Sequence, residues 1–279
     1  MTHGIAALPM YNVTPQHGML WRAFLRDALG EFARRAGVRE RIALLDEPLG
    51  DLFALWRSPD LLMSQTCGFP YRLLGLDRQV HLLATPVFNA PGCEGAWYRS
   101  VLLVSAQAYA NGATSLAACR GLRAACNSAD SHSGMNAFRH AVATTIPKSV
   151  RSERFFASVS FVGSHWNALR ALADDEADVA SIDCVTLAYV RDARPEMLES
   201  LREIGMTAAA PGLPFIASRT LPVAHAALLR DALDHACTLD ALRAKTLRLQ
   251  GFSRLAPADY AVIEQFADEA RANGYAELV

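Results

Sequence analysis

Short apolar segments rich in valine, isoleucine and leucine alternate along the chain with longer segments in which apolar residues recur at helical spacing. Continuous apolar runs are typical of buried strands, and the longer periodic segments are typical of amphipathic helices. The predicted strands are Ile5–Met10, Ile42–Leu45, Leu61–Ser64, Val80–Thr85, Val101–Val104, Ala124–Cys126, Ser158–Val162 and Val179–Ile182. Because strands that alternate with helices build sheets covered on both faces, the pattern predicts an α/β fold with mostly parallel sheets.

The predicted helices lie between these strands. The first of them, Gly18–Ala36, places its apolar residues on one stripe and ends before Gly37, a residue suited to the left-handed conformation that follows many helices. The other predicted helices are Leu49–Arg57, Gly134–Thr145, His165–Asp174, Val185–Arg191, Val223–Ala236 and Ala256–Ala272.

Two turn-rich stretches indicate a change of lobe. The first is Asn89–Gly95, and the second is Ala209–Pro214, which contains two prolines and a glycine. With hinge crossovers near residues 90–98 and 209–214, residues 1–97 and 213–279 form one discontinuous lobe. Residues 98–212 then form a second lobe inserted into the first.

The composition excludes several classes of partner. With 52% hydrophobic and 20% charged residues, the chain can bury a large core. Lys and Arg number 27 against 28 for Asp and Glu, so no excess of positive charge attracts nucleic acid or anionic lipid. No apolar run approaches the roughly 18 residues needed to span a bilayer. No signal peptide is visible, so we expect a cytoplasmic protein or a chain without its leader.

The six cysteines form neither a C-x-x-C pair nor a spacing suited to zinc. Most of them stand beside alanine, leucine or valine, so we interpret them as small buried apolar residues. Free thiols favour a reducing compartment, and their even number leaves disulfide bridges as the alternative in an oxidising one. The sequence also contains no cluster of metal ligands, no P-loop and no dinucleotide fingerprint. We therefore expect no metal and no cofactor.

The most informative stretch is Cys126–Met135, which lies between a predicted strand and a predicted helix. It contains Ser131, His132 and Ser133 directly before a glycine. Small hydroxyl side chains at such a turn lie beside free backbone N–H groups and the positive end of the helix dipole, which together suit an oxyanion. An ordinary helix N-cap explains the same residues equally well.

Three further turns place polar side chains after predicted strands. His165 opens a helix, where it either donates to an anion or caps that helix. Asp183 emerges at the carboxyl end of a strand, the edge where ligands gather in open α/β sheets, so it is a candidate for holding an amine or a donor of the site. In the first lobe, Ser64–Thr66 follows a strand in the same way.

These motifs, in this order, resemble the PhnD-like phosphate/phosphonate-binding proteins. The matching segments are Leu8-Pro9-Met10-Tyr11, Ser64-Gln65-Thr66-Cys67-Gly68, Tyr98-Arg99-Ser100, Asn127–Gly134, Gly163-Ser164-His165 and Glu176–Asp183. Members of that family are substrate-binding components of ABC transporters with the type II periplasmic-binding-protein fold. The resemblance implies a two-lobed protein that captures a small oxyanion, such as phosphonate or phosphate, in a cleft between its lobes by hinge closure. It also implies an ABC transporter permease as a partner.

The resemblance further implies roles for single residues. The family's hydroxyl turn wraps the phosphonate oxygens, its histidine and crossover tyrosine contact the same group, and an acidic residue recognises an amine. The predicted ligand-binding set is Tyr11, Ser64, Gln65, Thr66, Tyr98, Ser131, His132, Ser133, His165 and Asp183. His132 stands where many members have threonine, and Gln65-Thr66-Cys67 replaces a segment with glycine and tyrosine, so the identity of the oxyanion stays open.

An enzyme is the competing hypothesis. In it, Cys67, His165 and Asp183 act as nucleophile, base and orienting group. No feature of the sequence sets the distances between these residues, and cysteine at such a turn is commonly a buried residue. A ligand sensor that uses the same clamp is a third hypothesis.

Overall fold

The computed structural model describes residues 4–38, 42–45, 50–145 and 154–278. Contacts divide the chain into two compact units. Unit 1 comprises Met1–Asn89, Glu94–Ala96 and Pro211–Tyr260. Unit 2 comprises Ala90–Cys93, Trp97–Ala210 and Ala261–Val279. The sequence pattern predicted that all of residues 213–279 belong to the first lobe, and the structure corrects this for Ala261–Val279, which belong to unit 2.

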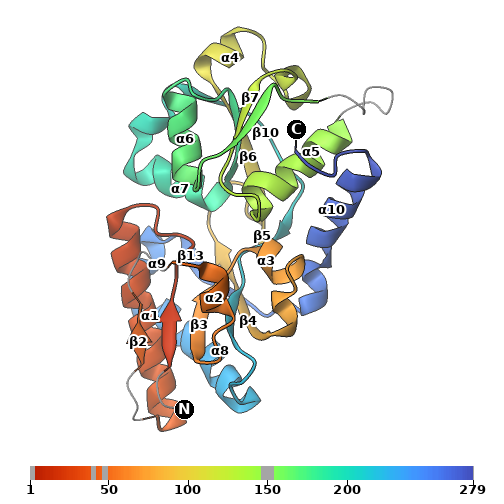
Figure 1. Ribbon diagram of the computed structural model, residues 1–279. Helices are drawn as coiled ribbons and strands as arrows, with labels where there is room; N and C mark the ends of the chain where they lie inside the picture. Colours follow the sequence, from red (N-terminus) through yellow and green to blue (C-terminus); the bar gives the residue numbers. More distant parts are fainter. Residues whose placement is uncertain (1–3, 39–41, 46–49, 146–153, 279) are drawn as a thin grey trace. The chain divides into compact units, whose positions relative to one another are not determined.

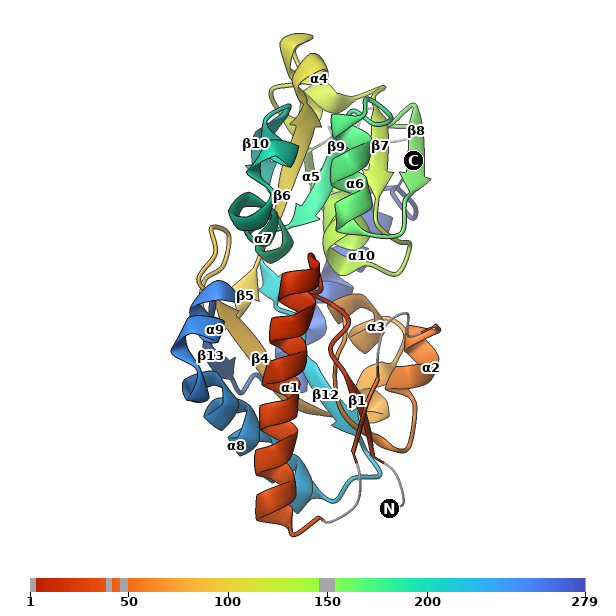
Figure 2. The ribbon, with the colours of Figure 1, turned by 90° about the vertical axis from the view of Figure 1, so that its left-hand side faces the viewer.

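Helix α10 (Ala261–Ala272) belongs to unit 2. It packs along helix α5 (Ala137–Thr145), and the two helices lie side by side in Figures 1 and 2. The ring of Phe266 in α10 stacks on the ring of His140 in α5, with their centroids 4.3 Å apart. An apolar stripe shows that a helix has a face to bury but not which unit covers it, so the sequence could not assign α10.

Within its described residues, unit 1 holds a six-stranded sheet with the order β13-β4-β12-β3-β1-β2. Helices α1 (Pro15–Ala36) and α8 (Val223–Leu239) lie side by side in this unit (Figure 2). The strands are β1 (Ile5–Ala7), β2 (Ala43–Leu44), β3 (Leu61–Gln65), β4 (Val80–Phe88), β12 (Phe215–Ser218) and β13 (Leu249–Ser253). The shorter helices are α2 (Leu52–Trp56), α3 (Gly68–Arg72) and α9 (Ala241–Thr246).

Unit 2 is built on a five-stranded sheet with the order β10-β6-β9-β7-β8, counted over the described residues. Its strands are β6 (Ser100–Ser105), β7 (Arg123–Cys126), β8 (Ser158–Phe161), β9 (Val179–Asp183) and β10 (Leu201–Met206). Besides α5 and α10, its helices are α4 (Ala106–Ala110), α6 (His165–Ala173) and α7 (Cys184–Ala193). Where the chain passes between the units, the short strands β5 (Trp97–Tyr98) and β11 (Ala210–Pro211) pair with each other.

Both sheets are mixed rather than mostly parallel. β1 runs parallel to β2 and β3, and β7 runs parallel to β8 and β9. The pairs β4–β12 and β6–β10 are antiparallel. Strands β4 and β10 each carry the chain toward the other unit, and strands β6 and β12 each carry it away from a crossover. Each pair therefore combines one strand of each kind, and its two strands run in opposite directions. Apolar runs do not reveal strand direction, which is why the sequence pattern overestimated the parallel content.

The predicted strands and helices are present, with shifts at their ends. Helix α1 ends as predicted at Gly37, whose φ is 65° and whose N–H donates to the carbonyl of Ala33. The predicted helix Leu49–Arg57 appears as α2, and Leu49 lies outside the described residues. The pattern did not predict β10 and β13, because polar and charged residues interrupt their apolar positions.

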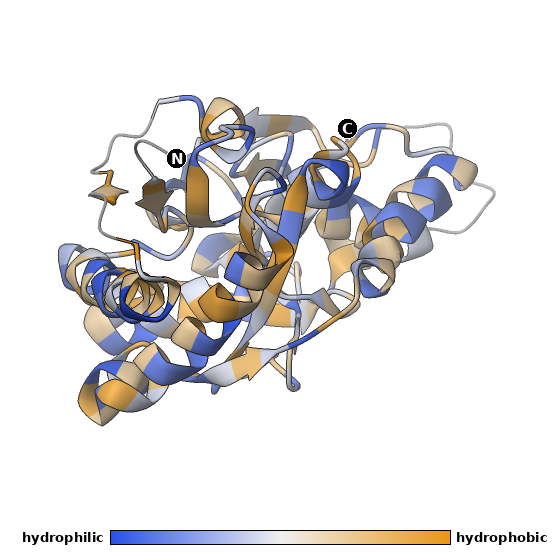
Figure 3. Cartoon of the chain, turned by 90° about the horizontal axis from the view of Figure 1, so that it is seen from below, coloured by the Kyte–Doolittle hydropathy of each residue, from blue (hydrophilic) through white to orange (hydrophobic). Residues whose placement is uncertain are grey.

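The core of unit 2 anchors the start of α5. Phe138 and Val142 of that helix are fully buried in an apolar cluster, and the Phe138 ring lies 5.3 Å from the ring of Phe156. Figure 3 shows hydrophobic and hydrophilic residues on the same helices, as expected where one face covers a sheet and the other meets solvent. In the described part of the chain, no helix has the length and apolar character needed to cross a membrane.

Candidate functional site

The turn at the start of α5 follows strand β7 and begins at Ser131. The Oγ of Ser131 accepts a hydrogen bond from the N–H of Gly134 at 3.1 Å, so this serine does cap the helix. Residues His132–Asn136 form a π-helical turn, in which the Asn136 N–H donates to the Ser131 carbonyl at 3.0 Å. Such wide turns are frequent at functional sites, and the first turn of a helix offers N–H groups to an anion.

The side chain of Ser133 contacts the second predicted turn. Its Oγ lies 2.8 Å from Nε2 of His165, the first residue of α6. Strands β7 and β8 pair in parallel, so their carboxyl ends, from which the two turns leave, are neighbours. The Ser133 carbonyl accepts hydrogen bonds from the hydroxyls of Ser100 at 3.1 Å and Ser181 at 2.8 Å. These bonds hold the backbone of Ser133 against β6 and β9.

One ring nitrogen of His165 is left unpaired by the part of the chain that the structure describes. Its Nδ1 is buried and has no hydrogen-bond partner among the described residues. Burial lowers the pKa of His165 to about 4, so the imidazole is neutral at pH 7. A neutral ring that accepts from Ser133 at Nε2 carries its proton at Nδ1, where it is a donor. An oxyanion is the kind of acceptor that satisfies such a buried donor.

Because Gly134 has no side chain, Asn127 and His165 can lie close to the backbone of the turn. A Cβ at this position would lie 2.1 Å from Oδ1 of Asn127 and 3.1 Å from Cε1 of His165. Nδ2 of Asn127 lies 3.5 Å from Nε2 of His165, and Oδ1 of Asn127 is buried without a partner in the described part of the chain. Asn127 is therefore a site residue that the predicted set leaves out. Its position directly after a buried strand was the signal that could have found it.

His132 lies in the same turn, but its ring packs inside unit 2. It is 2% exposed, and its ring centroid lies 6.2 Å from that of Tyr98 and 5.8 Å from that of Phe266. Burial, with the charge of His140 as a second cause, lowers the pKa of His132 to about 3. His132 is thus a neutral ring at pH 7. Ligand contacts by His132 and Tyr98 stay predictions.

Asp183 is 2% exposed and caps helix α7. Its Oδ1 accepts hydrogen bonds from the N–H groups of Val185 at 2.8 Å and Thr186 at 3.0 Å. A capping role of this kind stabilises a helix by about 0.5–2 kcal/mol. The predicted recognition of a ligand amine by Asp183 stays a prediction.

The four predicted residues of the first lobe lie in unit 1, after the parallel strands β1 and β3 or at the end of β3. Tyr11 is 2% exposed, and its ring meets the Phe88 ring edge-on at 5.3 Å. The Gln65 amide donates to a backbone carbonyl at 3.2 Å. The hydroxyls of Ser64 and Thr66 donate to the carbonyl of the following residue at 3.5 and 3.4 Å. The other six predicted residues belong to unit 2.

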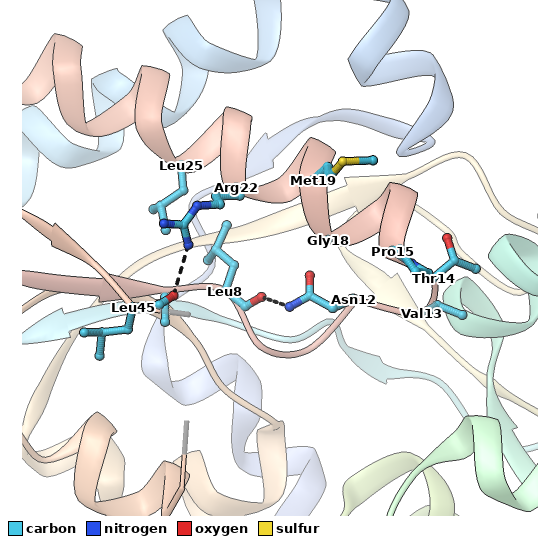
Figure 4. A pocket seen from close by; sticks show the side chains of 11 residues that line it. Leu8, Asn12, Val13, Thr14, Pro15, Gly18, Met19, Arg22, Leu25 and Leu45 are labelled. Carbon is cyan, nitrogen blue, oxygen red and sulfur yellow. Dashed lines mark hydrogen bonds between the residues drawn. The ribbon is translucent and has the colours of Figure 1, made fainter. Parts of the chain in front are cut away.

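Unit 1 also contains a pocket of about 430 Å³, which Figure 4 shows between the start of α1 and Leu45. Nη1 of Arg22 donates to the Leu45 carbonyl at 3.4 Å, and Nδ2 of Asn12 donates to the Leu8 carbonyl at 2.9 Å. None of the residues in the predicted ligand-binding set lines this pocket. It therefore gives no support to the predicted anion site. Among the described residues, no group of three or more His, Cys, Asp or Glu is placed to hold a metal ion.

Comparison with known proteins identifies one matching family and many solved structures with a similar fold. The family described as ABC transporter, phosphonate, periplasmic substrate-binding protein matches residues 57–262. The comparison with curated proteins finds no match.

Among solved structures, a binding protein component of an ABC phosphonate transporter from Pseudomonas aeruginosa has a TM-score of 0.75 at 18% identity, covering 99% of this chain and 88% of that one. PhnD1 from Prochlorococcus marinus in complex with methylphosphonate has a TM-score of 0.68 at 14% identity, over 98% of both chains. A Xanthomonas citri protein bound to chloride ion has a TM-score of 0.70 at 16% identity, over 98% of this chain and 99% of that one. At these identities the likeness is evidence for the fold alone.

Proposed function

The chain belongs to the phosphonate family of periplasmic substrate-binding proteins of ABC transporters, and from this premise we propose that it captures a small oxyanion, phosphonate or phosphate, at the turn that opens α5. The predicted family and the predicted α/β binding-protein fold are confirmed. Proteins of this family bind solutes and are not enzymes, so the catalytic hypothesis built on Cys67, His165 and Asp183 is set aside.

The observation that carries the proposal is the buried Nδ1 of His165 beside the first turn of α5. An oxyanion taken out of water needs several donors, because a buried charge without them is strongly disfavoured. The Nδ1–H of an imidazole that accepts from Ser133 at Nε2, and the N–H groups of the π-helical turn, are donors of this kind. Each charge-assisted hydrogen bond contributes about 1.5–3 kcal/mol net, so a few of them support micromolar binding without a protein cation.

Two solved structures support the choice of ligand and of partner. One is a component of an ABC phosphonate transporter, and the other is in complex with methylphosphonate. A phosphonate is therefore the first ligand to test, and an ABC permease is the partner that we propose. The closure of two lobes around the ligand, and the ligand contacts of Tyr11, Ser64, Gln65 and Thr66, stay predictions from the sequence.

Thermal unfolding in the presence of phosphate, methylphosphonate, 2-aminoethylphosphonate or sulfate tests the proposal. We expect at least one of the four anions to raise Tm, because a ligand at 100 times its Kd adds about 2.7 kcal/mol to the free energy of unfolding. Sodium chloride at matched ionic strength is the control for general salt effects. An unchanged Tm with all four anions would contradict the proposed function.

The two serines of the turn form a matched pair of variants. Ser131→Ala removes the cap on the Gly134 N–H, so we expect a loss of about 1 kcal/mol in the free energy of unfolding and a smaller effect on affinity. Ser133→Ala removes the hydroxyl beside His165, so we expect affinity to fall by roughly 10-fold to 100-fold. Titration calorimetry with the anion found above measures affinity, and urea unfolding without ligand measures stability.

The comparison of the two variants separates binding from capping. If Ser133→Ala unfolds as early as Ser131→Ala and binds the anion as tightly as the wild type, its hydroxyl is structural, and this part of the site is refuted.

A further inference from the structure

Two cysteines from distant parts of the sequence are in contact in unit 2. Sγ of Cys93 lies 3.5 Å from Sγ of Cys184, although 91 positions separate them. Cys93 ends the segment Ala90–Cys93 of the first crossover, and Cys184 is the first residue of α7. From their apolar neighbours in the sequence, the cysteines are predicted to be buried apolar residues. The structure corrects this for Cys67, Cys93 and Cys237, which are partly exposed.

The backbone around both sulfurs is held in place. The N–H of Cys93 donates to the carbonyl of Ala90 at 2.9 Å, which closes a tight turn. Gly92 in this turn has a φ of +97°, and a Cβ there would lie 3.0 Å from Cβ of Cys184, so only glycine lets the turn approach α7 this closely. The N–H of Cys184 donates to the carbonyl of Arg99 at 3.2 Å.

A disulfide requires the sulfurs to approach each other by about 1.5 Å more, to the S–S bond length of about 2.05 Å. Rotation about the Cα–Cβ bonds moves a sulfur by this much without a shift of the backbone. The two sulfurs are therefore close enough to form an intramolecular disulfide.

The two thiols differ in access. Cys184 is 2% exposed, whereas Cys93 is partly exposed, so an external disulfide reaches Cys93 first. The hydrogen bond to Cys93, burial, and the nearby charge of Asp183 raise the pKa of Cys184 far above its usual value. The first and largest of these causes disappears once the Cys93 sulfur is bound to another sulfur. Cys184 then becomes the better nucleophile for the second step.

We propose that Cys93 and Cys184 are a site of reversible disulfide formation, which ties the crossover segment Ala90–Cys93 to the first turn of α7. With glutathione disulfide as the oxidant, the Cys93 thiolate attacks one glutathione sulfur, forms a mixed disulfide and releases one glutathione. The Cys184 thiol loses its proton to solvent, its sulfur attacks Sγ of Cys93, and the second glutathione leaves. Two protein thiols lose two electrons, and one glutathione disulfide gains them to become two glutathione thiols.

Two other cysteines serve as internal references in the same chain. Cys119 and Cys126 are 0% exposed, and burial raises the pKa of Cys119 to about 11 and of Cys126 to about 12. Buried thiols of this kind exchange slowly with an external disulfide. The oxidant should therefore select Cys93 and Cys184 over them.

The test uses the full chain in redox buffers of glutathione and glutathione disulfide, with alkylation of the remaining thiols by N-ethylmaleimide. Intact-mass measurement should show the loss of two hydrogen atoms in the oxidising buffer, reversed by dithiothreitol. Peptide mapping should show one linked pair that contains Cys93 and Cys184. Because the bond closes a long loop of the unfolded chain, Tm of the oxidised protein should rise by roughly 4–10 °C.

Single variants complete the design. Cys93→Ser and Cys184→Ser should each lose both the linked peptide and the rise in Tm. Cys237→Ser, which changes a partly exposed cysteine of unit 1, should keep both. Equal alkylation of Cys93 and Cys184 in the oxidising and reducing buffers, or a linked pair made from other cysteines, overturns the proposal. Because the wild-type mapping needs no ligand, its outcome does not depend on whether the proposed function holds.

Discussion

Gly134→Ala is expected to weaken anion binding by roughly 100-fold or more, because two site residues occupy the space of the new methyl group. Its Cβ would lie 2.1 Å from Oδ1 and 2.8 Å from Cγ of Asn127, and 3.1 Å from Cε1 of His165. Asn127 and His165 must both shift, so the contact between His165 and Ser133 is lost or lengthened. Titration calorimetry with the anion identified by thermal unfolding measures the effect.

The same variant should remain folded, with a loss of about 1–3 kcal/mol in the free energy of unfolding that is typical of overpacking. Gly30→Ala in α1 is the matched control, since nothing lies within 4 Å of a Cβ at that position. It should bind the anion as the wild type does and be slightly more stable, because alanine favours a helix. Wild-type affinity in Gly134→Ala would show that the anion does not depend on this turn.

Lowering the pH from 7 to 4.5 should reduce the free energy of unfolding by about 2 kcal/mol through His132 alone. Burial, with the charge of His140, lowers the pKa of this ring in the folded protein to about 3, whereas the usual value of 6.5 applies to the unfolded chain. Between these values the unfolded chain binds a proton that the folded protein does not. Stability is therefore complete above pH 6.5 and falls as the pH decreases. His165, with a pKa lowered by burial to about 4, adds an effect of the same sign.

Urea unfolding at several pH values between 7 and 4.5 measures this slope. His132→Asn should be less stable at pH 7 but should show a shallower decrease toward pH 4.5, because asparagine does not titrate. His235→Asn, at an exposed position of α8, is the matched control and should keep the wild-type slope. Identical slopes in His132→Asn and in the wild type would show that this ring does not link folding to protons.

Local sequence patterns pointed to the two turns that form much of the candidate site. The sequence predicted a hydroxyl turn after one strand and a histidine turn after another, and the structure joins Ser133 and His165 because those strands, β7 and β8, pair in parallel. The sequence left a cap and an anion site as equal alternatives for the hydroxyls. In the structure the two hydroxyls have different contacts: Ser131 caps the helix, and Ser133 contacts His165. Asn127 was left out of the predicted ligand-binding set, because one asparagine after a strand is a weak signal.

What the sequence by itself determined was local in character: the places of strands and helices, the end of α1 at Gly37, and the turns that carry hydroxyls and histidines. Tertiary structure alone decided the direction of β12 and β10, the assignment of α10 to unit 2, and the meeting of Cys93 with Cys184. The physical reason is the distance along the chain over which each kind of interaction acts. Apolar periodicity and capping act over a few neighbouring residues, whereas strand partners and helix contacts join residues far apart in the chain, and no short pattern specifies them.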